Sequence, residues 1–156
     1  MKKALVLAAA LAVLVSAGSA SPRATGCGQL LLRPRATQAG DTTLFGHVSS
    51  LKRNGARFEL RFDPALWLTG VTASRASLED TGSGDVPNDY FIRDPDHKLL
   101  SFHVPATTPV TDLVRGSCLR HTTVAALARS SERAQVSFWI RVHNDTIRSL
   151  DQQFRP

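Results

Sequence analysis

The chain has few of the residues that carry common motif chemistry. Its 156 residues include two cysteines, one methionine and one tyrosine, and its longest apolar run is the twelve residues 4–15. A helix that crosses a bilayer needs about 20 apolar residues, so the sequence predicts no transmembrane segment. Neither H-E-x-x-H, G-x-S-x-G nor C-x-x-C occurs. These absences exclude the enzymes and zinc sites that such motifs define.

The first 20 residues have the pattern of a secretory signal peptide. Met1-Lys2-Lys3 precedes the apolar run, and the small residues of 16–20 follow it. We therefore expect cleavage after Ala20 and an exported protein, either extracellular or retained at the cell envelope. The remaining 136 residues fit one domain. Within them, 21–41 is small and polar and is expected to be flexible, while 42–156 is expected to form a single β-rich domain.

The charge is positive but dispersed. Removing Lys2 and Lys3 lowers the formal net charge from +6 to +4, and arginines are scattered along the chain. A nucleic-acid-binding surface gathers basic residues on one face with interleaved aromatic residues, and no such cluster is evident. The sequence therefore predicts no nucleic-acid partner.

The two cysteines, Cys27 and Cys118, are expected to form a disulfide bond in an oxidising compartment. In the chain-entropy model, a bond across so long a loop stabilises the fold by up to about 4 to 5 kcal/mol. Lipidation of Cys27 is an alternative, although Pro22 and Arg23 separate it from the apolar run.

Residues 51–64 contain the clearest structural signal, a β-hairpin turn at Asn54-Gly55. A two-residue loop there places Leu51 opposite Phe58 and His47 opposite Phe62. The predicted core face holds every second residue on each strand: Phe45, His47, Ser49, Leu51, Phe58, Leu60 and Phe62. The predicted outer face holds the alternate positions: Val48, Ser50, Lys52, Arg57, Glu59 and Arg61.

Shorter patterns follow the hairpin. Asp63-Pro64 predicts the start of a short helix that Gly70 closes, and 72–79 predicts a second helix capped by Thr72. Residues 90–93 and 98–104 predict a second hairpin around the turn 94–97, and 110–114 predicts a strand. Thr122 or Thr123 is expected to cap a helix that runs to Arg129.

The last predicted strand, 136–143, places Val136, Phe138, Ile140 and Val142 on one face, with Asn144-Asp145 as a bulge or turn after it. The sequence thus predicts a mainly β (α+β) fold. We expect a small twisted antiparallel sheet, or a partly closed OB-like barrel, of five or six strands with two or three short helices.

Three blocks of the sequence, 46–68, 86–90 and 149–156, resemble segments of uncharacterised small secreted proteins of high-GC Gram-positive bacteria. The resemblance covers most of the chain after residue 20. It implies an exported single domain and no particular activity.

Several polar residues are candidates for a site. His47 is placed by the predicted register on the apolar face, where burial would disfavour its charged form. Asp80, Asp85 and Asp89 lie in a glycine-containing loop and are a weak calcium candidate without the D-x-D-x-D-G pattern. Asp94, Asp96, His97 and His103 cluster around the second turn, where capping aspartates are the more ordinary interpretation. The sequence predicts no metal site and no cofactor.

The function that the sequence favours is a non-enzymatic binding module with an unidentified protein or small ligand as partner. Its candidate surface is Trp139, Arg141 and His143, opposite the apolar row of the last strand, together with Arg57, Arg61 and His47. Arg57 and Arg61 are equally typical of a solvated outer face. The alternative is a small secreted hydrolase or metal-dependent enzyme that uses His47, His103 and nearby aspartates.

Overall fold

A computed structural model describes residues 39–114, 118–130 and 136–154. The predicted signal peptide and Cys27 lie outside these residues, so the disulfide bond with Cys118 stays a prediction. The described chain is mainly β, as predicted, with one multi-stranded sheet and two short α-helices. None of its helices is long and apolar enough to span a membrane. The elements are β1 (Thr42–Asn54), β2 (Arg57–Thr69), α1 (Gly70–Thr81), the 3₁₀ turn η1 (Pro87–Asp89), β3 (Tyr90–Arg93), β4 (Leu100–Pro105), β5 (Pro109–Val114), β6 (Cys118–Thr123), α2 (Val124–Leu127), β7 (Ser137–His143) and β8 (Thr146–Gln152).

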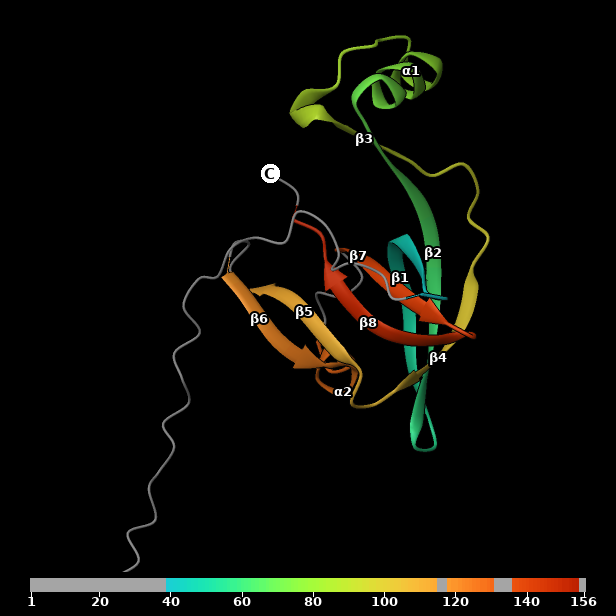
Figure 1. Ribbon diagram of the computed structural model, residues 1–156, viewed down its shortest axis with the longest axis vertical. Coiled ribbons are helices and arrows are strands. Elements are labelled where there is room, and N and C mark those ends of the chain that lie inside the picture. Colours follow the sequence, from blue (N-terminus) through green and yellow to red (C-terminus); the bar gives the residue numbers. More distant parts are fainter. Residues whose placement is uncertain (1–38, 115–117, 131–135, 155–156) are drawn as a thin grey trace, which may run out of the picture.

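The strands β1, β2, β4, β7 and β8 pair into a closed ring, and they lie together in Figure 1. β1 pairs with β2 and β7, β7 pairs with β8, and β4 pairs with both β2 and β8. The β4–β8 contact is parallel and is made at His103 and Thr146. This order, β1-β2-β4-β8-β7-β1, is that of an OB-like barrel, and β5 and β6 extend the sheet from the edge of β8.

The apolar cluster that holds the barrel together comes from alternate residues of its strands. Phe62, Leu60, Phe138 and Ile140 are fully buried, and α2 adds Val124. The predicted inward row Phe58, Leu60 and Phe62 is confirmed, and Arg57 and Arg61 are exposed on the other face as predicted. Phe45 is also buried but lies outside this core cluster.

The first hairpin exists, but its predicted register is wrong. Asn54 pairs with Arg57, so the turn residues are Gly55, which has a φ of 60°, and Ala56. Leu51 therefore faces Leu60 and not Phe58.

A bulge further changes which residues of β1 face the core. The register shifts between Val48 and Ser50, so Ser49 is an extra residue on β1. One extra residue exchanges the inward and outward positions of β1 on its N-terminal side. Val48 therefore points into the core and is 1% exposed. His47 pairs with Asp63 and lies outside the core cluster. The prediction that His47 lies on the apolar face is therefore wrong.

No helix forms directly after Asp63-Pro64. β2 continues to Thr69, and its last residues, Leu66 to Thr69, pair with β3. Gly70, with a φ of 58°, begins α1 instead of ending a helix, and Thr69, not Thr72, is its N-cap residue. Gly82 closes α1 in the left-handed conformation, with its N–H 3.0 Å from the Leu78 carbonyl oxygen. Strand pairing here outweighs the local helix-start signal of Asp-Pro.

The predicted second hairpin is also wrong. β3 and β4 are both strands, but each pairs with β2, β3 at its end and β4 at its beginning. In Figure 1, β2 extends beyond the barrel to α1 and β3, and the chain returns alongside it to β4. Strands β6 and β8 were not predicted, and α2 ends at Leu127 and not at Arg129. The turn at Asn144-Asp145 is confirmed, since both residues have positive φ and join β7 to β8.

Candidate binding site

Four aromatic rings gather on the outer face of the barrel. The Phe45 ring lies 5.1 Å from that of Trp67 and 5.0 Å from that of Trp139, measured between centroids. Tyr90 stacks on Trp67 at 4.2 Å with an interplanar angle of 13°. Geometries of this kind stabilise aromatic pairs by about 0.5–1.5 kcal/mol beyond the effect of burial. We call these four residues the aromatic cluster.

Strand register explains why the cluster forms. Phe45 on β1 is the direct partner of Trp139 on β7 and of Ala65 on β2. Trp67 follows Ala65 by two residues and therefore shares its face of β2. Tyr90 comes from β3, which begins opposite Thr69. The cluster thus depends on the unbroken course of β2, the feature that the sequence did not predict.

Beside the cluster lies a hollow of about 350 Å³, which we call the aromatic hollow. The described residues that line the hollow are mainly apolar and include Phe45, Ala65, Leu66, Trp67, Pro95 and Trp139. Leu66 is 50% exposed. A concave apolar surface with a few polar groups is the usual form of a small-ligand site.

The polar groups around the hollow are not all satisfied. Trp139 donates a 2.6 Å hydrogen bond from Nε1 to Oε1 of Gln153, which fixes its ring. Thr43 and Asp96 also line the hollow, and the Thr43 hydroxyl is buried with no hydrogen-bond partner among the described residues.

The predicted surface of β7 is only partly at this site. Trp139, Arg141 and His143 do share the face opposite the core. Arg141, however, donates from Nε to the Ser149 hydroxyl at 2.8 Å, and Nδ1 of His143 lies 3.1 Å from a carboxylate oxygen of Asp41. Neither side chain lines the hollow in the described structure.

The other predicted binding residues are elsewhere. Arg57 and Arg61 are exposed on β2, in the part that pairs with β4, and the nitrogen Nε of Arg61 is 4.0 Å from a Glu59 carboxylate oxygen. His47 Nε2 lies 3.0 Å from the Ser137 hydroxyl oxygen. His103 is exposed on β4 and pairs with Glu59, so the structure does not bring the two histidines of the enzyme hypothesis together.

The calcium candidates are separated. Asp80 lies 2.7 Å from Nη2 of Arg93, whose other terminal nitrogen lies 3.0 Å from Glu79. The hydrogen bond with Glu79, and next the charge of Asp80, raise the pKa of the Arg93 guanidinium. Asp85 and Asp89 instead line a small hollow beside Gly70. In the described ranges, the only group of three potential ligand residues within reach of one ion is Asp63, Asp94 and His97.

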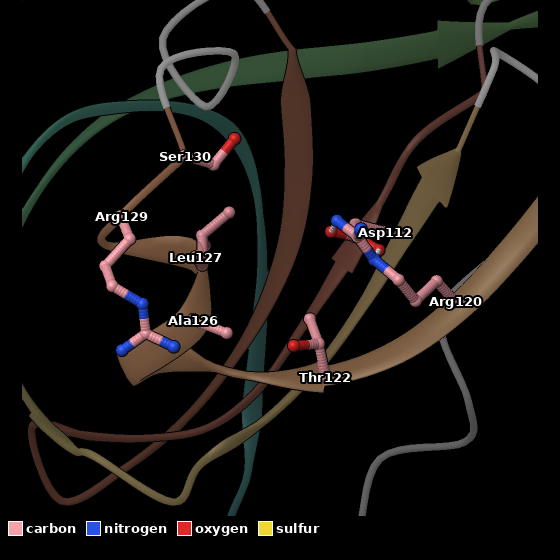
Figure 2. Close-up of a pocket in the computed structure, with 7 residues that line it drawn as sticks. All are labelled: Asp112, Arg120, Thr122, Ala126, Leu127, Arg129 and Ser130. Atoms are coloured by element: carbon pink, nitrogen blue, oxygen red, sulfur yellow. Dashed lines mark hydrogen bonds and ion pairs between the residues drawn. The ribbon is translucent and has the colours of Figure 1, made fainter. Parts of the chain in front are cut away.

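A second hollow, of about 470 Å³, lies between β5, β6 and α2 (Figure 2). Asp112 is the one carboxylate among the described residues that line it, and it accepts hydrogen bonds from Nε and Nη2 of Arg120 at 2.9 and 2.5 Å. The Asp112 side chain is 8% exposed and that of Arg120 is 52% exposed. Because each group already satisfies the other, we interpret this pair as a clamp across the β5–β6 ladder.

Phe45, Trp67 and Tyr90 were not among the predicted site residues. The available signal was the two-residue spacing of Ala65 and Trp67, which places both on one face of an extended chain. Comparisons with known proteins add no constraint on the site: no protein-family model, curated protein or solved structure matches the chain.

Proposed function

We propose that this protein is an exported binding module whose ligand inserts an apolar, ring-bearing group into the aromatic hollow. The ligand is either a small molecule or a side chain of a partner protein, since both offer the same chemistry to the site. The observation that carries the proposal is a mainly apolar hollow of about 350 Å³ lined by Phe45, Trp67 and Trp139.

Two physical arguments support this function. Aromatic side chains offer large apolar area with few rotatable bonds, so little conformational entropy is lost when a ligand binds them. A ligand that carries a hydrogen-bond donor beside its ring would also meet Asp96, a polar residue that lines the hollow, which gives orientation as well as affinity.

The two tryptophans of the chain provide a direct test, because both belong to the aromatic cluster. Their indole N–H signals in a ¹⁵N-correlated NMR spectrum therefore report on this region alone. We would titrate the protein with 2-naphthol, indole and 1-anilinonaphthalene-8-sulfonate. We expect both indole signals to shift in a saturable way with at least one of these probes.

A pair of matched variants then locates the binding. Leu66→Asp places a charge at the hollow, whereas Val71→Asp places the same charge on α1, where Val71 is 77% exposed and does not line the hollow. We expect Leu66→Asp to weaken probe binding at least about tenfold, because a desolvated carboxylate opposes an apolar ligand, and Val71→Asp to leave it unchanged. Equal losses in both variants, or unmoved indole signals with every probe at millimolar concentration, would contradict the proposal.

A further inference from the structure

Asp63, Asp94 and His97 bring three potential metal ligands together beside the aromatic hollow. Each offers one ligand atom, and these atoms all lie within 4.8 Å of one another. Asp63 belongs to β2, whereas Asp94 and His97 belong to the segment that leads from β3 to β4. The group therefore joins two parts of the chain that are about 30 residues apart in sequence.

The distances leave room for a shared cation. Nδ1 of His97 lies 3.6 Å from an Asp63 carboxylate oxygen and 3.5 Å from an Asp94 carboxylate oxygen. Both exceed the range of about 2.7–3.2 Å usual for N–H···O bonds. Two ligand atoms at about 2.0–2.1 Å from a tetrahedral zinc ion are separated by roughly 3.4 Å. A cation could thus be bound with only small rotations of the three side chains.

A separate observation concerns the other oxygen of Asp63. Its Oδ1 is buried and has no hydrogen-bond partner among the described residues. A cation on Oδ2, the oxygen that faces His97, would neutralise the charge of this carboxylate and so lower the cost of its unpaired Oδ1. His97, by contrast, is 81% exposed, so the site has an open approach from solvent.

We propose that Asp63, Asp94 and His97 form a binding site for a divalent transition-metal ion of the zinc class. One imidazole and two carboxylates favour such an ion over calcium or magnesium, which prefer all-oxygen sites. Three protein ligands leave at least one position for water or for a donor atom of another molecule. The bound ion would tie the 94–97 segment to β2. Because Pro95 and Asp96 line the aromatic hollow, the ion would also hold one of its walls in place.

The test is isothermal titration of the tag-free, EDTA-treated protein with zinc chloride. We expect one ion per chain, with His97→Ala and Asp94→Asn each weakening binding at least about tenfold. Matched controls are His103→Ala and Asp96→Asn, which alter a neighbouring histidine and aspartate outside the group. Both controls should bind zinc as the wild type does.

Thermal unfolding gives a second readout that does not depend on any hollow ligand. Since an ion that binds only the folded chain stabilises it, zinc should raise the Tm of the wild type but not that of His97→Ala. Absence of binding to the wild type at 1 mM zinc, or unchanged zinc affinity in His97→Ala, would overturn the proposal. The first outcome would leave His97 as an ion-pair partner of the two aspartates. Neither outcome affects the probe titration that tests the hollow.

Discussion

Gly46 is a position where one added methyl group tests the packing of the barrel. Gly46 pairs with Pro64 on β2 and with Phe138 on β7, so it lies between two strands. A Cβ atom at Gly46 would lie 2.0 Å from the Asp63 carbonyl oxygen and 2.9 Å from the Pro64 Cα. Both contacts are with backbone, which cannot rotate away as a side chain can. Gly46→Ala should therefore force β1 and β2 apart.

The magnitude follows from the size of this displacement. Ordinary contact begins near 3.4 Å, so the two strands must separate by about 1.4 Å at this point. Overpacking of a core costs about 1–3 kcal/mol. Weakening of one or two ladder hydrogen bonds adds about 1 kcal/mol each. We expect Gly46→Ala to lower the free energy of unfolding by roughly 2–5 kcal/mol, a large part of the about 5–15 kcal/mol of a typical domain.

Urea denaturation followed by circular dichroism measures this loss, and two other glycines serve as controls. Gly55→Ala meets no atom within 4 Å but has a φ of +60°, so it should cost only about 1–2 kcal/mol from backbone strain. At Gly84 the nearest atom is 3.7 Å away, and Gly84→Ala should change stability by less than about 0.5 kcal/mol. A loss at Gly46 smaller than the loss at Gly55 would refute the reasoning.

Two further predictions concern charged residues. Arg120→Ala should lower the free energy of unfolding by about 1–3 kcal/mol, because it leaves the buried Asp112 carboxylate unpaired. Arg120→Lys should recover only part of this loss, since lysine cannot donate two parallel hydrogen bonds to the carboxylate. Urea denaturation of the wild type and both variants measures whether their stabilities fall in this order. Arg57→Ser and Arg61→Ser should each change stability by less than about 0.5 kcal/mol in the same assay, because both side chains are exposed. A cost above about 1 kcal/mol at either position would show that it is more than a solvated surface residue.

Residues 57–62 show what an alternating sequence pattern can predict. The alternation of Phe58, Leu60 and Phe62 with charged residues predicted both the strand and its inward face, and the structure confirms both. The same reasoning applied to β1 was wrong for His47 and Val48, because the bulge at Ser49 inverts the alternation. Nothing in the sequence of β1 marks that extra residue, which is defined only against its partner strand.

The candidate site was predictable only in part, and Trp67 shows why. Its neighbours Asp63 and Pro64 form a genuine local helix-start signal, yet β2 continues because β1 and β3 pair with it on either side. Trp139 was predicted on the outer face, since its own strand alternates regularly. The contacts among the four rings form only when β1, β2, β3 and β7 are aligned, because each strand supplies one ring.

By itself, the sequence determined that this chain forms β-strands with an apolar inner face at 57–62 and 137–143, with a tight turn before the first and after the second. These features depend on residues within a few positions of each other. Tertiary structure alone decided the closure of the barrel, the aromatic hollow, and the grouping of Asp63 with Asp94 and His97. Each of these depends on the register between strands distant in sequence, and register is set by the packing of the whole core.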